Sequence, residues 1–92
     1  MGKPTPSHSS LKEKIEPAND ADILRALESL PVKYWNYIGD NTRHIGPMAE
    51  TFKEATGLGD GMTIDFIDAF GVLLAAVRGL ASQVDDLQDA AA

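Results

Sequence analysis

The sequence predicts a small α+β domain, with a β-hairpin or short strands, two to three helices, and a long C-terminal helix that packs in a coiled-coil-like bundle. Three observations support this prediction. The β-branched and aromatic run VKYWNYI is followed by the turn residues GDNT. Stretches with helical periodicity lie on both sides of that run. Apolar residues recur at heptad spacing along the last part of the chain.

Length and composition restrict the class of protein. A chain of 92 residues forms one domain and buries roughly 60–65% of its unfolded surface, so we expect it to associate with other copies. It has no cysteine and therefore no disulfide or thiolate metal site. A net charge of -6 argues against a nucleic-acid partner. No apolar run approaches ~18 residues, so no membrane span is expected, and the N-terminus does not resemble a signal peptide.

The first residues, 1–10, are rich in proline and serine and predict an extended lead-in. In the stretch SLKEKIEP, Ser10 and Glu13 fit a capping box at the start of a short helix. Pro17 stops that helix after about one turn.

The middle of the chain is predicted to form a helix followed by a hairpin. Asn19 or Asp20 caps the helix DADILRALESL, which Pro31 ends. The run VKYWNYI is then a strand with apolar side chains on both faces, so a partner is expected over each face. His44 and Ile45 pair back on this strand after the turn.

A second helix, MAETFKEATG, is predicted after the hairpin. Pro47 suits its first turn, Phe52 points inward, and Gly57 ends it. The stretch TIDFI, residues 63–67, is predicted to be a third short strand. Asp68 then caps the last helix.

The last helix carries the strongest periodic signal. Its apolar residues recur at alternating spacings of three and four, which is a heptad seam of about three repeats: Phe70, Leu73, Val77, Leu80, Val84, Leu87 and Ala91. Such a seam joins helices of different copies; the alternative is a helix that packs on its own domain. Association is favoured because the chain is short. The valine and leucine pattern alone leans toward two strands.

Four blocks of the sequence resemble, in order and spacing, the C-terminal intramolecular chaperone domain of phage endosialidases, tail spikes and tail fibres. The blocks read LPxxxWxY, RHIGPMA, FxxAxGLG and DAxGVxLAA, and the resemblance runs from about Ser7 to Leu80. It implies a trimerisation domain over residues 7–92 whose partners are its own copies and an upstream segment of the same chain. It also implies a virion tail fibre or spike assembled in the cytoplasm of the bacterial host.

The resemblance further implies release of the domain by serine self-cleavage, with residues 1–6 as the lead-in on the other side of the cut. The family pattern Ser-Asp-x-x-Leu-Lys-x-x-Ile reads SHSSLKEKI here, which makes Ser7 the nucleophile and Lys12 the base. A serine hydroxyl needs a base to attack a carbonyl. Lysine serves only when neutral, its free pKa is about 10.4, and burial at a trimer interface would lower that pKa.

Two features leave the cleavage reaction open. The residue pattern alone favours a linker residue at Ser7 and a solvated charge at Lys12, and the resemblance reverses this for their positions but not for their activity. His8 replaces the aspartate of the family pattern and removes an acceptor that would hold the loop, so we expect slow or lost cleavage.

His44 has three interpretations. It is a histidine satisfied within a turn, a metal ligand, or a residue that supports cleavage by orienting Ser7 or stabilising the oxyanion, as the resemblance implies. The metal interpretation is weak because no second ligand stands at a suitable spacing. The structural and supporting roles remain open. Trp35 is expected in the core or an interface rather than in a sugar-binding platform.

Two functions remain after these observations. One is a self-cleaving chaperone that trimerises an upstream fibre, and the other is an uncleaved structural oligomerisation cap. An enzyme acting on an external substrate is disfavoured, because the sequence has no carboxylate pair, phosphate loop or metal cluster. No cofactor is expected.

Overall fold

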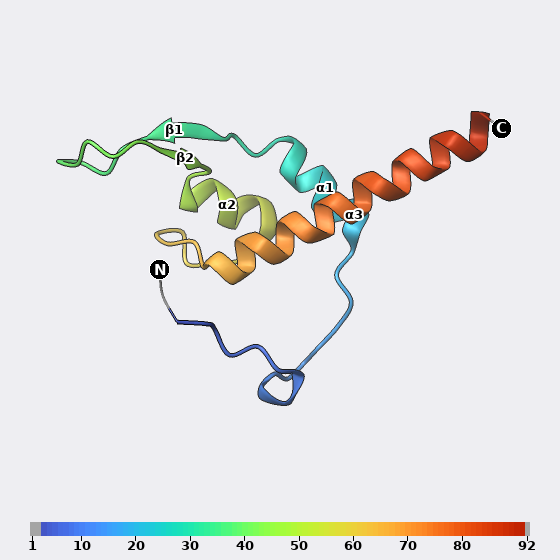
Figure 1. The fold of residues 1–92 in the computed structure, drawn as a ribbon, viewed down its shortest axis with the longest axis horizontal. Helices are drawn as coiled ribbons and strands as arrows, with labels where there is room; N and C mark the ends of the chain where they lie inside the picture. Colours follow the sequence, from blue (N-terminus) through green and yellow to red (C-terminus); the bar gives the residue numbers. More distant parts are fainter. Residues whose placement is uncertain (1–2, 92) are drawn as a thin grey trace.

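The structure is a computed structural model that describes residues 3–91, so Met1 and Gly2 of the predicted lead-in lie outside the described residues. In chain order its elements are the 3-10 turn η1 (Ser9–Leu11), α1 (Asp20–Glu28), β1 (Lys33–Trp35), β2 (His44–Gly46), α2 (Ala49–Thr56) and α3 (Phe66–Ala91). Figure 1 shows α3 as a long rod, with α1, α2 and the hairpin on one side and the N-terminal segment on the other. The predicted α+β class is confirmed.

Helix α1 packs directly on α3. The Asn19 side chain accepts the N–H of Asp22 at 3.0 Å, so Asn19 is the cap among the two alternatives. The helices approach closely at Gly79, where an added Cβ would lie 2.7 Å from the backbone oxygen of Asp20. The glycine is therefore required by packing, which the sequence pattern did not indicate. Arg78 Nε also lies 3.4 Å from a carboxylate oxygen of Asp20.

The predicted hairpin is present but short. Strands β1 and β2 are antiparallel, with Tyr34 opposite Ile45 and Trp35 opposite His44. Tyr34 and Ile45 are 67% and 61% exposed. This outer face is therefore uncovered within one chain, and its cover by a partner stays a prediction.

Helix α2 is positioned by its two ends. Met48 occupies the position before the helix, so Pro47 precedes α2 and does not belong to its first turn, as had been predicted. Phe52 is buried as predicted. Gly57 ends the helix with a φ of 75°, the left-handed conformation that favours glycine.

The predicted third strand is wrong. Residues 63–65 are irregular, and α3 begins at Phe66. The cause is the side chain of Asp65, which accepts the N–H groups of Ile67 at 2.7 Å and Asp68 at 3.4 Å. A carboxylate in this position caps a helix, so Asp65 performs the role predicted for Asp68.

The apolar core is small for a chain of this length. Its buried apolar residues are Phe52, Val72, Ala75 and Ala76, and no large side chain among the described residues is fully buried. The accessible surface is 7762 Å², whereas a compact monomer of this mass exposes about 5,200 Å². The radius of gyration is 16.1 Å, against about 12 Å for a compact domain. A single chain therefore leaves unusually much surface uncovered.

Most of this uncovered apolar surface lies on α3. The six large residues of the heptad seam are between 44% and 70% exposed. The buried residues of α3 are Val72, Ala75, Ala76 and Gly79. They lie on another face of the helix, where Gly79 meets α1. The alternative that the seam packs on its own domain is therefore wrong.

Helix α3 is long and apolar enough, by length and composition alone, to cross a membrane. This differs from the sequence expectation that no segment could do so. Only 22% of the apolar window is buried inside the structure. Helices that pack on protein pass the same test, and α3 packs on α1 through one face, so this finding is weak evidence for a membrane span.

Candidate functional site

The N-terminal segment forms one tight turn at the predicted cleavage site. The N–H of Leu11 donates to the carbonyl of His8, and the N–H of Lys12 donates to that of Ser9, each at 3.0 Å. His8 is the capping residue, and its Nδ1 accepts the N–H of Ser10 at 3.0 Å. The predicted capping box that began at Ser10 is therefore wrong.

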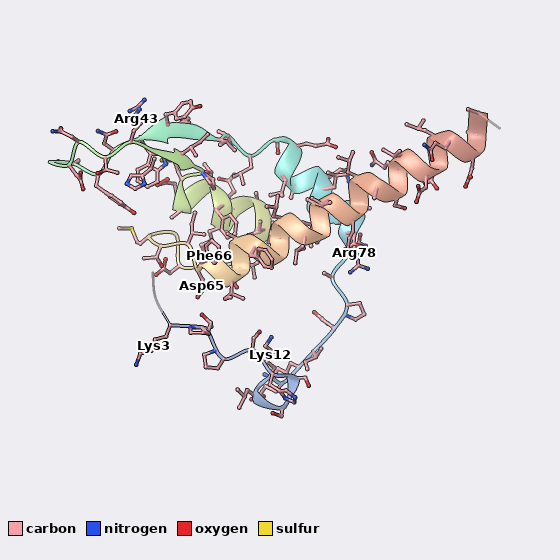
Figure 2. All side chains as sticks on the ribbon, in the orientation of Figure 1. Lys3, Lys12, Arg43, Asp65, Phe66 and Arg78 are labelled. Carbon is pink, nitrogen blue, oxygen red and sulfur yellow. The ribbon has the colours of Figure 1, made fainter. Side chains whose placement is uncertain are left out.

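This turn brings Ser7 and Lys12 together. Lys12 Nζ donates to Ser7 Oγ at 2.8 Å, and Figure 2 marks Lys12 on the turn. Residues five apart do not share a face of an α-helix. They meet here because Ser7 precedes a single 3-10 turn and Lys12 follows it. In this hydrogen bond the charged ammonium donates, whereas a base must accept the hydroxyl proton.

The turn stands apart from the rest of the chain. Among the described helices and strands, α1 contacts α2 and α3, β1 contacts β2, and η1 contacts none of them. Figure 1 shows the segment separated from α3. Leu11 and Ile15, which flank Lys12, are both 69% exposed. Within one chain, nothing described removes water from the Ser7–Lys12 pair.

His44 lies elsewhere, on the hairpin. Its ring stacks on Trp35 with 4.8 Å between centroids and meets the edge of Tyr37 at 5.4 Å. In Figure 2, the neighbouring Arg43 lies across α3 from Lys12. A single chain therefore brings Ser7 and Lys12 together and leaves His44 apart. Residues 3–91 contain no group of His, Cys, Asp or Glu able to hold a metal ion.

Two carboxylates organise the loops near the hairpin and before α3. The N–H of Thr42 donates to Asp40 at 2.8 Å, and this bond is the main cause that lowers the pKa of Asp40. Asp60 accepts the N–H groups of Met62 at 2.8 Å and Thr63 at 2.7 Å, which lower its pKa below the ordinary value of 3.8. A carboxylate held in its charged form in this way stabilises a loop and is a poor proton donor.

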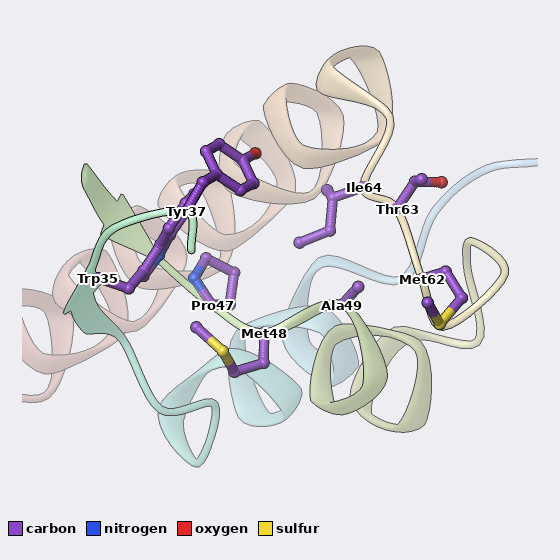
Figure 3. A pocket seen from close by; sticks show the side chains of 8 residues that line it. All are labelled: Trp35, Tyr37, Pro47, Met48, Ala49, Met62, Thr63 and Ile64. Carbon is purple, nitrogen blue, oxygen red and sulfur yellow. The ribbon is translucent and has the colours of Figure 1, made fainter. Parts of the chain in front are cut away.

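An open groove of about 600 Å³ lies between the hairpin and the loop before α3. Figure 3 shows Trp35, Tyr37 and Met48 facing Met62 and Ile64 across it. The lining is mostly apolar and brings no acid–base pair together. The groove therefore lacks the groups that an enzyme acting on an external substrate requires.

The prediction that His8 removes an acceptor is wrong. Nδ1 of His8 accepts the N–H of Ser10 at 3.0 Å. The available signal was the capping position itself, which selects side chains that accept a hydrogen bond. The structural reason to expect slow or lost cleavage is thereby removed.

Comparison with known families finds one match. The model of a peptidase family described as "chaperone of endosialidase" matches residues 7–61, which is more than half of the chain. The match begins at Ser7, includes the turn, α1, the hairpin and α2, and ends before α3. No curated protein matches the chain. No solved structure matches it either.

Proposed function

The chain belongs to the family of endosialidase chaperones, and from this we propose that it is an intramolecular chaperone released from an upstream phage tail fibre or spike by self-cleavage before Ser7. Residues 7–92 are the chaperone, which drives trimerisation and folding of the upstream segment in the host cytoplasm. The observation that carries the proposal is the 2.8 Å hydrogen bond between Lys12 Nζ and Ser7 Oγ. It lies at the point where the family match begins.

The reaction uses these two side chains. Neutral Lys12 takes the hydroxyl proton of Ser7 while Oγ attacks the carbonyl carbon of Pro6. The bond from that carbon to the nitrogen of Ser7 breaks, and Lys12 returns the proton to this nitrogen. Water then hydrolyses the ester between Pro6 and Ser7, which separates the segment that ends at Pro6 from the chaperone.

Assembly supplies the change in protonation that the reaction needs. Lys12 is exposed in the single chain, and burial disfavours the charged form of a lysine and lowers its pKa. Exposed Leu11 and Ile15 give the turn an apolar surface that a neighbouring copy can cover. Since the hairpin of the same chain lies across α3, the supporting His44 comes from that neighbouring copy.

The surface of α3 supports three copies. Beside the seam, Ile67 and Leu74 are also exposed, at 42% and 50%. They widen the apolar stripe beyond the narrow seam that a helix pair buries. A bundle of three helices covers a wider stripe on each helix, so we favour a trimer over the pair suggested by the valine and leucine pattern.

Intact mass measured over time at pH 8 tests the proposal. The protein should lose the segment that ends at Pro6, and Ser7→Ala and Lys12→Ala should each abolish the loss. Ser9→Ala is the matched control, because only the backbone of Ser9 takes part in the turn, and it should cut like the wild type. Loss that persists in Ser7→Ala would remove Ser7 from the mechanism. An assembled protein that never cuts would instead favour an uncleaved oligomerisation cap.

A further inference from the structure

The ring of His8 holds the turn in a way that depends on its protonation. A backbone N–H can only donate, so the Ser10 N–H at 3.0 Å requires an unprotonated Nδ1 on His8. The hydroxyl of Ser10 lies 2.9 Å from the same nitrogen. Both contacts are available to neutral histidine, with its proton on Nε2. When Nδ1 takes up a proton, the backbone N–H of Ser10 loses its acceptor, whereas the Ser10 hydroxyl can accept from Nδ1–H.

Little else holds this turn. Besides the His8 contacts and the Lys12–Ser7 hydrogen bond itself, the described residues give the turn two backbone hydrogen bonds, from Leu11 and Lys12. None of the other described helices and strands contacts it. The charged residues of the segment that carries His8 are Lys3, Lys12, Glu13, Lys14 and Glu16. Loss of the capping acceptor acts directly on the turn that places Lys12 against Ser7.

We propose that His8 is a positioning residue whose neutral ring holds Lys12 against Ser7 and makes self-cleavage sensitive to mild acid. The inference rests on the proposed self-cleavage and adds to it a proton-dependent step outside the reacting pair. Histidine takes up a proton between about pH 5 and 8. In its protonated form, Nδ1 presents a donor to the Ser10 N–H, the turn opens, and the two reacting side chains separate.

Two variants with an uncharged residue at position 8 separate the loss of the His8 cap from a change in the protonation of Lys12. His8→Asn keeps a capping acceptor that does not titrate, and His8→Ala has none. Cutting rates are measured by intact mass from pH 5.5 to 8.5, with the assembly state checked in each buffer. The cutting rate of the wild type should equal that of His8→Asn at high pH and approach that of His8→Ala at low pH. The rates of His8→Asn and His8→Ala should differ roughly fivefold, as expected for the loss of a helix cap.

The ratio of the wild-type rate to the His8→Asn rate removes the part of the pH dependence that both proteins share. A ratio that stays constant from pH 5.5 to 8.5 would overturn the role of His8 while leaving self-cleavage intact. His8→Ala cutting as fast as His8→Asn at every pH would also overturn it.

A second measurement does not depend on cutting. In the uncleaved Ser7→Ala protein, the amide resonance of Ser10 is followed by NMR as His8 titrates. The resonance should shift with the midpoint of the His8 ring, and His8→Asn should abolish this shift. A Ser10 amide resonance that does not shift as His8 titrates would overturn the inference, even if the wild-type protein cuts normally. If the Ser10 amide of Ser7→Ala follows the His8 titration but the wild-type protein does not cut at any pH, the proposed function fails. The role of His8 in cleavage then fails with it.

Discussion

Trp35 is the one tryptophan of the chain and reports on the hairpin at the scale of a single residue. Its Nε1 is buried and has no hydrogen-bond partner among residues 3–91, and its ring stacks on His44. We predict a blue-shifted emission whose intensity changes in His44→Gln, because that variant removes the stacked imidazole. A red-shifted emission that soluble quenchers reach freely would contradict the partial burial of Trp35.

Asp60 provides a second prediction at this scale. Its pKa is lower in the folded protein than the ordinary 3.8, chiefly through the N–H of Met62. Its hydrogen bonds therefore stabilise the folded chain above that value, and the contribution is lost as the pH falls through the folded pKa. Asp60→Ala should lower the melting temperature at pH 7, and the difference from wild type should vanish below the folded pKa.

The control for Asp60 is Asp60→Asn, which keeps an acceptor but no charge. Its melting temperature should lie between those of the wild type and Asp60→Ala at pH 7, at one protein concentration. A difference between wild type and Asp60→Ala that is the same at pH 7 and at acid pH would contradict the role of the carboxylate.

At the scale of the elements, the contact between α1 and α3 makes opposite predictions for two glycines of one helix. Gly79→Ala places a Cβ 2.7 Å from the backbone of Asp20, and we expect it to destabilise the protein by about 1–3 kcal/mol. Gly71 has nothing within 4 Å of the added Cβ. Gly71→Ala should therefore stabilise by about 0.5–1 kcal/mol through helix propensity. Denaturant unfolding measures both, and equal effects at the two positions would contradict the close packing.

The elements that the sequence predicted well are those with strong local chemistry. The cap at Asn19, the left-handed Gly57 and the turn between the strands specify their own conformations. The stretch TIDFI was misassigned because its β-branched residues favour a strand, while the Asp65 side chain caps α3. The hydrogen bond of the Asp65 cap therefore outweighs the strand propensity of these residues, and the residue pattern alone did not show which of the two would prevail.

The candidate site was predictable only in part. The resemblance selected Ser7 and Lys12, and the structure places them within hydrogen-bond distance; their catalytic roles stay predictions. The cap formed by His8 depends on the orientation of its ring, which spacing does not specify. The separation of His44 from the turn depends on how the hairpin and the N-terminal segment lie about α3, which is a property of the tertiary structure.

At the scale of the whole molecule, the exposed seam of α3 predicts that a single charge can dissociate the assembly. Leu80→Asp places an unpaired carboxylate at the interface of every copy and removes apolar burial of about 1–3 kcal/mol per chain. Ser82→Asp is the matched control, because two residues along a helix lead to nearly the opposite face. We expect monomers at micromolar concentration for Leu80→Asp and an unchanged assembly for Ser82→Asp. Dissociation by both variants, or by neither, would contradict the assignment of the seam.

The central claim is that three copies assemble through α3 and thereby cover the surface that one chain leaves exposed. Sedimentation equilibrium of the wild-type protein at micromolar concentration tests it most directly, because it measures mass without reference to shape. A trimer gives three times the chain mass of 9.9 kDa, and this is the result we predict. A stable species with the mass of one chain would contradict the claim, since the exposed seam would then have no partner.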